Sequence, residues 1–248
     1  MTDALLEIKD LEIVYQTDEE TVHAVNRISL NVNTKETLGL VGETGAGKTT
    51  TLKCVAGIQD FDAGTIQIGG KDIRKDPLAC KRQFAYIPDN PDLYEYLTGI
   101  QYLNFTADIF GVGAREREER IRTYGEAFEI TASLGDLIST YSHGMKQKLA
   151  LLSAFVHQPK LLLLDEPFVG LDPKAAVVLK DIMHSICAGG GAIFFSTHVL
   201  DVAEKLCNKV AMIKDGALVA CGDMETVVKQ GQSLESIFME VVEHADTD

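Results

Sequence analysis

Short apolar runs, some of them alternating with polar residues, dominate both ends of the chain and predict strands. The first 35 residues are typical of antiparallel strands separated by an acidic turn at residues 18–20. Their apolar positions are the run from Leu5 to Tyr15 and, at period two, Ile28, Leu30 and Val32. Three nearly continuous apolar runs further along are typical of parallel strands buried on both faces. These runs are Thr37–Val41, Leu161–Leu164 and Ala192–Ser196.

The middle of the chain has a different pattern. Between residues 89 and 158 apolar residues recur at helical spacing, and residues 115–126 form a charged amphipathic stretch. One helix face consists of Ile100, Leu103, Ala107 and Phe110. We expect a single composite α/β domain. In this prediction residues 1–88 and 159–248 form a core with a mostly parallel sheet and an N-terminal antiparallel β subdomain, and residues 89–158 form an inserted helical subdomain.

Shorter elements complete the predicted fold. A helix should follow the strand Thr37–Val41 and end near Gly57, and a second helix should span Pro173–Cys187 between two of the buried runs. A short strand pair is expected around Gly64–Ile68 and further strands at Phe84–Ile87, Val210–Ile213 and Leu218–Ala220, with two short helices at the end of the chain.

Composition indicates a folded protein, and net charge disfavours two classes of binding partner. With 46% hydrophobic and 24% charged residues the chain is ordinary for a folded globular protein. Lys and Arg total 23 against 37 Asp and Glu, so a net charge of −14 disfavours nucleic acid and anionic lipid as partners. The five cysteines include no C-x-x-C pair, which fits a reducing cytoplasm.

The sequence predicts no direct insertion into a membrane. The N-terminus lacks the basic and apolar regions of a signal peptide. The most apolar stretch, Leu149–Leu164, is interrupted by polar residues and is shorter than the roughly 20 apolar residues of a membrane-spanning helix.

A glycine-rich loop lies between the strand Thr37–Val41 and the helix that follows it. It fits the pattern G-x-x-x-x-G-K-[ST], in which backbone N–H groups surround phosphate groups at the N-terminus of a helix. Lys48 should reach the β- and γ-phosphates, and the Thr49 hydroxyl should bind Mg²⁺. Because strand, loop and helix occur in the required order, a glycine-rich turn without a ligand is disfavoured. The expected contacts are Gly42, Glu43, Thr44, Gly45, Ala46, Gly47, Lys48, Thr49 and Thr50.

Two adjacent carboxylates, Asp165 and Glu166, follow the buried run Leu161–Leu164. Open α/β sheets bind their ligands at this end of the strands. Asp165 can hold the Mg²⁺ ligand shell, which leaves Glu166 free to orient the attacking water or accept its proton. Taken alone, the pair also fits an acidic strand end without chemistry.

The order of motifs along nearly the whole chain resembles the ABC ATPase family. The phosphate-binding loop and the helical insert are followed by a signature segment, the Asp165–Glu166 pair, a Gly-Leu-Asp turn and a histidine after the next strand. These further segments are Tyr141-Ser142-His143-Gly144-Met145-Lys146-Gln147, Gly170-Leu171-Asp172 and Ser196-Thr197-His198.

The resemblance implies a P-loop NTPase core that uses ATP and Mg²⁺ and works as a dimer, with two ATP molecules between two subunits. Ser142 and Gly144 begin a helix and would address the γ-phosphate of the ATP on the opposite subunit. Asp172 would lie at the interface between the two subunits, and His198 would contact the γ-phosphate. Glu166, His198 and Lys48 are therefore the expected catalytic residues. By position Tyr15 would stack on adenine, although a core aromatic is the alternative.

Two segments depart from the usual family pattern. Asp89 stands where a glutamine usually contacts Mg²⁺ and links to the membrane subunit. It could still ligate the metal, or it could be an exposed loop carboxylate without a role. In the signature, His143 and Met145 replace the usual glycine and glutamine, while Ser142 and Gly144 remain. With the segment from Asn90 to Thr98, these variants resemble the branch that exports peptides, drugs or bacteriocins.

We therefore expect an ATP-binding and ATP-hydrolysing subunit of an ABC transporter. ATP-driven dimer closure would energise a separate integral membrane permease in the direction of export, with this chain cytoplasmic and peripheral on the inner face of the membrane. The second ATPase subunit would be a copy or a relative. The alternative is a soluble ABC ATPase that energises protein or metallocofactor assembly. A regulatory module without turnover is disfavoured by the retained catalytic residues, and a DNA-repair ATPase by the lack of a sustained heptad run.

Overall fold

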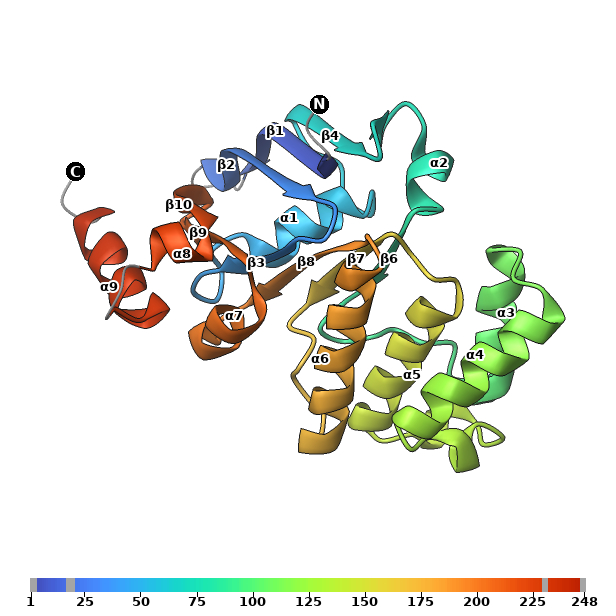
Figure 1. Cartoon of the computed structure of the whole chain (residues 1–248). Coiled ribbons are helices and arrows are strands. Elements are labelled where there is room, and N and C mark those ends of the chain that lie inside the picture. The colour runs from blue at the N-terminus through green and yellow to red at the C-terminus, as the bar shows by residue number, and fades with distance from the viewer. Residues whose placement is uncertain (1–3, 17–20, 229–231, 246–248) are drawn as a thin grey trace.

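The fold was analysed in a computed structural model of the 248-residue chain, which describes residues 4–16, 21–228 and 232–245. The acidic turn expected at residues 18–20 lies outside the described residues. Two sheets and the helices around them make up the molecule (Figure 1). The described secondary structure confirms the mixed α/β class, the parallel sheet and the separate antiparallel β part.

The larger sheet has six strands in the order β10-β9-β3-β8-β7-β6. All neighbouring pairs are parallel except β9 and β10. Every residue of the inner strands β3 and β7 is buried, as their apolar sequences require. The strands are β3 (Thr37–Val41), β6 (Phe84–Ile87), β7 (Leu161–Asp165), β8 (Ala192–Thr197), β9 (Lys209–Lys214) and β10 (Ala217–Asp223).

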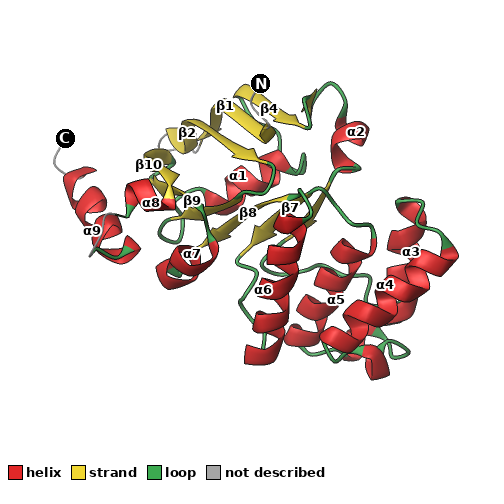
Figure 2. Ribbon diagram, in the orientation of Figure 1, coloured by secondary structure: helices red, strands yellow, loops and turns green. Residues whose placement is uncertain are grey.

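The smaller sheet is antiparallel and has the order β2-β1-β4-β5. It faces one side of the larger sheet, with helix α1 (Lys48–Val55) between the two (Figure 2). One hydrophobic core joins these layers and contains Leu6, Leu52 and Leu163. The strands are β1 (Ala4–Gln16), β2 (Thr21–Asn33), β4 (Ala63–Ile68) and β5 (Lys71–Asp72).

The helical segment predicted for residues 89–158 packs against the other side of the larger sheet. A second core continues from this segment into the sheet and contains Leu103, Leu149 and Leu162. On the predicted apolar face, Leu103 and Ala107 are buried, and Ile100 and Phe110 pack at the edge of this core. The helices on this side include α3 (Gly99–Ile109), α4 (Ala114–Ala127), α5 (His143–Val156) and α6 (Pro173–Ala188).

Two short helices were missing from the sequence-based prediction. They are α2 (Pro77–Lys81) and α7 (Leu200–Leu206). Each spans less than two turns, so the helical period hardly repeats within it. The two helices expected at the end of the chain are α8 (Met224–Val227) and α9 (Leu234–Ala245).

Candidate nucleotide and catalytic site

The candidate site lies at the carboxyl ends of the parallel strands. Strands β3, β6, β7 and β8 run in the same direction, so the loops that follow them emerge at one edge of the sheet. These loops carry the glycine-rich segment 42–47, Asp89, Glu166 and His198 in that order. The fold thus gathers residues from four separate parts of the sequence.

The glycine-rich loop is a close-fitting backbone cradle. A Cβ atom on Gly47 would stand 2.4 Å from the Ala24 carbonyl oxygen, and one on Gly42 would stand 2.3 Å from the Ile213 carbonyl oxygen. Gly47 also has a left-handed φ of +103°, which side chains disfavour. Only glycine fits at these two positions, so the loop's backbone can close around a phosphate group.

The Lys48 side chain lies inside this loop. Its Nζ donates hydrogen bonds to the carbonyl oxygens of Gly42 and Glu43, both at 2.8 Å. Burial lowers the pKa of Lys48, and the nearby carboxylates of Glu166 and Asp165 oppose that shift. A partly desolvated ammonium group inside this loop is suited to bind an anionic ligand such as phosphate.

Asp165 is fully buried at the end of β7. Its Oδ1 accepts a hydrogen bond from the Ser196 hydroxyl, whereas its Oδ2 has no hydrogen-bond partner. Burial raises the pKa of Asp165, and the charges of Asp89 and Glu166 add to the increase, while the hydroxyls of Ser196 and Thr49 oppose it. A buried carboxylate oxygen without a hydrogen-bond partner, close to the Thr49 hydroxyl and to two further carboxylates, is suited to bind a hard divalent cation.

Glu166 and His198 face each other across the ends of β7 and β8. Glu166 Oε1 lies 2.8 Å from His198 Nδ1, with Glu166 mostly buried and His198 about half exposed. The backbone of Glu166 has a φ of +46° and its N–H donates to the Ser196 carbonyl oxygen at 3.2 Å. A non-glycine residue in this conformation is strained, and such strain recurs at functional sites. The arrangement leaves an acid–base pair beside Asp165.

Two further predicted residues are exposed to solvent. Tyr15, at the end of β1, is 46% exposed, so it is not the core aromatic considered above. Its hydroxyl accepts a hydrogen bond from the Gln59 amide, which fixes the ring's orientation. Asp89 is exposed, and its Oδ1 accepts a hydrogen bond from the Asn90 N–H. Because β6 and β7 are parallel neighbours with Ile87 opposite Leu164, the loop that carries Asp89 leaves the sheet beside the end of β7, where Asp165 lies.

The predicted signature residues form a second group. Ser142 is the N-cap of α5, and its hydroxyl accepts from the Met145 N–H at 3.3 Å. Asp172 is the N-cap of α6 and pairs with Lys148 at 2.6 Å. This ion pair and the N–H of Ala175 hold the pKa of Asp172 below its usual value. The turn from Glu166 to Asp172 joins this group to Asp165, Glu166 and the other residues at the carboxyl ends of the strands.

Ser196, Gln59 and Lys148 were not singled out as functional in the sequence. Ser196 contacts both Asp165 and the Glu166 N–H, and its position before Thr197-His198 at a strand end was the available signal. Gln59 lies 44 positions from Tyr15, and Lys148 is one of two lysines on its helix, so no local pattern marks either residue.

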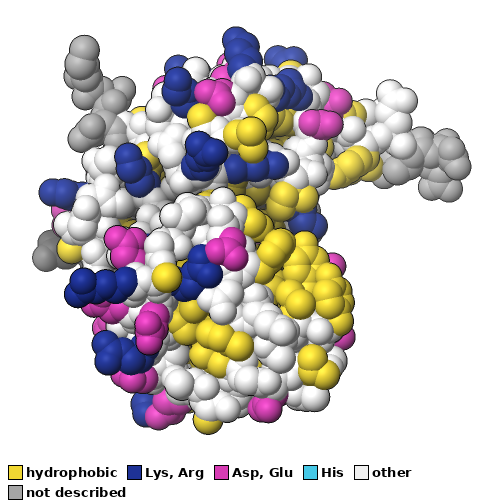
Figure 3. Space-filling model, turned by 90° about the vertical axis from the view of Figure 1, so that its right-hand side faces the viewer, with side chains coloured by type: hydrophobic (Ala, Val, Ile, Leu, Met, Phe, Trp, Pro, Cys, Tyr) yellow, Lys and Arg dark blue, Asp and Glu magenta, His cyan; other side chains and the backbone are white. Residues whose placement is uncertain are grey.

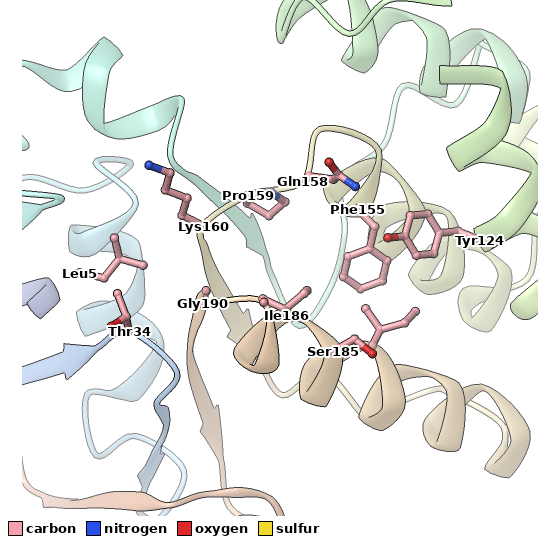
Figure 4. Close-up of a pocket in the computed structure, with 13 residues that line it drawn as sticks. Leu5, Thr34, Tyr124, Phe155, Gln158, Pro159, Lys160, Ser185, Ile186 and Gly190 are labelled. Atoms are coloured by element: carbon pink, nitrogen blue, oxygen red, sulfur yellow. The ribbon is translucent and has the colours of Figure 1, made fainter. Parts of the chain in front are cut away.

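A large cavity in the described part of the chain lies elsewhere. It has a volume of about 700 Å³ and lies near the amino ends of β7 and β8, the opposite edge of the sheet. Tyr124, Phe155 and Ile186 enclose it, and the Tyr124 hydroxyl points into it (Figure 4). None of the predicted site residues lines this cavity.

Comparisons with known proteins identify the family. The family model described as "ABC transporter" matches residues 25–169. The ABC-type transporter ATP-binding protein EcsA of Bacillus subtilis is 33% identical over 242 residues, which cover 96% of each chain. The Bacillus subtilis ABC transporter ATP-binding protein NatA is 29% identical, over 95% of this chain and 97% of its own.

Solved structures agree with these matches. A structure described as the ATP-binding subunit of an ABC transporter has a TM-score of 0.90 and 35% identity, and the match covers 96% of this chain and 99% of the other. The dimeric cassette MJ0796 bound to ADP and Pi has the same fold, with a TM-score of 0.81 at 20% identity, covering 89% of this chain and 99% of its own. In the described residues, no helix has both the length and the apolar character needed to cross a membrane. The chain belongs to the ABC transporter family, as an ATP-binding subunit that hydrolyses ATP.

Proposed function

We propose that two such subunits, identical or related, close on MgATP, hydrolyse it and thereby drive a separate integral membrane permease, in the direction of export. The pair formed by Glu166 and His198 beside buried Asp165 carries the hydrolytic part of this proposal. In this proposal the chain is cytoplasmic and peripheral, held at the inner face of the membrane by the permease. The single domain with an inserted helical subdomain at residues 89–158 is part of the same proposal.

Each predicted residue at the carboxyl ends of the parallel strands has a chemical role that suits its surroundings. Lys48 exchanges its two carbonyl partners for phosphate oxygens, and the N–H groups of the glycine-rich loop bind the same phosphates. Asp165 Oδ2 and Thr49 would hold Mg²⁺, with Asp89 at its outer side. The ion would neutralise charge on the phosphates. Tyr15 offers its exposed ring to the adenine.

Glu166 acts on water in this proposal. His198 Nδ1 fixes the Glu166 carboxylate on one side, and the strained turn holds its backbone, so one carboxylate oxygen remains to orient an attacking water and accept its proton. In a dimer, Ser142 and Gly144 would contact the γ-phosphate across the interface, and Asp172 would lie at the seam. This part rests on the family resemblance and on the position of Ser142 at a helix N-terminus.

An apolar surface supports a permease as partner. Tyr94 makes ring contacts with Tyr96, Tyr102 and Phe105 at centroid distances of 5.7–6.1 Å. Tyr96 is 75% exposed, and Ile109, one turn after Phe105 on α3, is 63% exposed. We call these five residues the aromatic surface. A broad apolar area is visible from the side of the molecule where α3 lies (Figure 3). Aromatic residues in such a patch are typical of protein interfaces.

The loop that carries Asp89 connects this surface to the signature helix. Glu95, between Tyr94 and Tyr96, forms an ion pair with Lys146 of α5. The Glu95 carbonyl oxygen accepts a hydrogen bond from the Ser139 N–H at 3.1 Å. A partner that binds the aromatic surface would therefore sense displacement of α5. We propose this loop as the mechanical link between hydrolysis and transport.

Relatives with described roles support the permease and the export direction. A Bacillus subtilis relative, 31% identical over 80% of this chain, is described as a linearmycin resistance ATP-binding protein. A structural neighbour, cbiO1 from Clostridium perfringens, is described as part of the ABC transporter complex cbiONQ. Resistance to a compound is a natural outcome of export.

Co-purification from native membranes tests this proposal. The tagged chain should bring down a multi-span membrane protein in stoichiometric amount after gentle solubilisation. A Tyr96→Ser, Phe105→Ser double variant should lose that protein and keep its ATP binding. The control is Val177→Ser, because Val177 is 56% exposed on α6, away from the aromatic surface. If only soluble partners co-purified, the assembly-energising alternative would replace transport.

A further inference from the structure

The turn that follows Glu166 lies against the first turns of α5. A Cβ on Gly144 would stand 2.8 Å from the Gly170 carbonyl oxygen, so the two backbones touch. Two residues further on, the Asp172 carboxylate pairs with Lys148 Nζ at 2.6 Å. Segment 170–172 therefore follows the side of α5 that begins with the signature residues.

His143 adds a side-chain contact between segment 170–172 and α5. A Cβ on Gly170 would stand 2.6 Å from His143 Cδ2 and 2.9 Å from its Nε2, closer than real Cβ contacts come. Gly170 also has a φ of +78°, a conformation that side chains rarely adopt. The imidazole ring of His143 thus occupies the space that a side chain at position 170 would need. Position 143 usually holds glycine in this family, and a glycine could not make this contact.

We propose that His143 is a positioning residue whose ring locks the turn 166–172 to the N-terminus of α5. The proposal rests on the function proposed above, in which Glu166 acts on the subunit's own ATP while Ser142 and Gly144 act on the ATP of the opposite subunit. The lock makes these two segments move as one body. Closure of the signature over one ATP then places Glu166 for hydrolysis of the other.

The first test removes the ring. In the purified full-length chain, His143→Ala should lower kcat about tenfold and reduce the cooperativity of ATP hydrolysis, while the Kd of the monomer for a fluorescent ATP analogue changes less than about twofold. His143→Gln should restore at least half of kcat, because a planar amide can also cover Gly170. The control His184→Ala removes an exposed histidine from α6 and should change none of these values. Unchanged kcat and cooperativity in His143→Ala would overturn the proposal.

A double-mutant cycle tests the contact itself. Gly170→Ala should lower kcat about thirtyfold in the wild-type background, because the new methyl group strains the backbone and displaces the imidazole. In the His143→Ala background the same change should cost only about threefold, since strain alone remains. Equal fold-changes in the two backgrounds would show that the residues are not coupled. Thermal unfolding of each variant identifies any that fail to fold, and the His143 variants, altered at an exposed position, remain informative.

Failure of the lock and failure of the proposed function give different results. If Glu166→Gln did not accumulate an ATP-bound dimer, the dimer mechanism itself would be wrong whatever His143 does. If Glu166→Gln accumulated the dimer and adding His143→Ala left its lifetime and assembly unchanged, only the lock would be wrong. The expected result is that His143→Ala shortens the lifetime of the trapped dimer about tenfold.

Discussion

Glu166 Oε1 lies 2.8 Å from His198 Nδ1, although 32 positions separate the two residues in the chain. The contact forms because β7 and β8 are parallel neighbours, so the residues just after each strand meet at the sheet edge. A carboxylate that is mostly buried and held by an imidazole keeps a fixed orientation toward a third group. This is the relationship expected of a general base and its partner.

Glu166→Gln should reduce ATP hydrolysis by about 10²- to 10⁴-fold, because the amide cannot accept a proton from water. Phosphate release measures the loss, and a fluorescent ATP analogue should bind as tightly as before. Glu225→Gln, which changes an exposed acid on α8, serves as the control and should hydrolyse ATP normally. Near-normal turnover in Glu166→Gln would assign the base to another residue.

Asp165→Asn should stabilise the nucleotide-free chain and remove its metal-dependent activity. The pKa of Asp165 is raised by burial, so the folded state holds its proton more tightly than the unfolded state. Such a carboxyl costs stability once the pH exceeds its folded pKa, and the cost disappears as the pH falls below the unfolded value. At pH 8 we expect Tm to rise by about 2–4 °C in scanning calorimetry. Exposed Asp181→Asn should not raise Tm, and a lower Tm for Asp165→Asn would contradict the argument.

Gly47→Ala should destabilise the nucleotide-free chain far more than Gly45→Ala. Both glycines have left-handed φ values, +103° and +90°, so both variants incur about 1 kcal/mol of backbone strain. Only at Gly47 does the new methyl group meet a backbone atom, the Ala24 carbonyl oxygen at 2.4 Å. Urea unfolding should show a difference of about 2 kcal/mol or more between the variants. Equal losses would mean that the loop relaxes away from Ala24.

His157 should make the stability of the chain depend on pH. Its ring stacks on Phe110 at a centroid distance of 3.7 Å, and burial, with a smaller effect of Arg120, lowers the pKa of His157 to about 4. Between pH 6.5 and 4 the unfolded chain therefore binds more protons, and stability falls as the pH is lowered through this window. The slope should approach about 1.4 kcal/mol per pH unit, the value for one proton.

Urea unfolding at a series of pH values measures the slope due to His157. His157→Phe keeps a ring against Phe110 and removes the titrating group, so it should flatten the curve in this window. His184→Gln, at an exposed position, should leave the slope in place. If the wild type and His157→Phe gave parallel curves, another group would control the acid sensitivity.

Tyr15→Leu should weaken ATP binding by about 5- to 150-fold, because stacking of a base on an aromatic ring contributes about 1–3 kcal/mol. Tyr15→Phe keeps the ring and loses only the hydrogen bond from Gln59, so its Kd should change by less than about fivefold. Inorganic pyrophosphate, which has no base, should bind all three proteins alike. A leucine variant with unchanged Kd for ATP would remove Tyr15 from the adenine contact.

The strands and long helices were predictable because each has enough residues to show its period. The five buried residues of β7 and the buried Leu103 and Ala107 of α3 follow directly from their sequences. Helices α2 and α7 were missed because seven residues or fewer do not establish a 3.6-residue repeat. The roles assigned to the site residues remain predictions that the experiments above address.

Contacts between distant residues were the part that sequence could not supply. The partnership of Tyr15 with Gln59 and the hydrogen bond from Ser196 to Asp165 depend on which strands become neighbours. The contact of His143 with Gly170 needs the backbone angle of Gly170 as well as the packing of α5. Motifs located the chemistry, and the fold determined the geometry around it.

The aromatic surface lies within a short stretch of chain, from Tyr94 to Ile109, which is anchored by the capping box of Thr98 and Gln101 at the start of α3. The residues proposed for phosphate binding and hydrolysis lie outside this stretch. Under the function proposed above, in which the aromatic surface binds the permease, partner recognition can diverge between gene duplicates while the hydrolytic residues stay the same. Exchanging this stretch between two relatives should then exchange their permeases, so that specificity would be a transferable property of one helix and the loop before it.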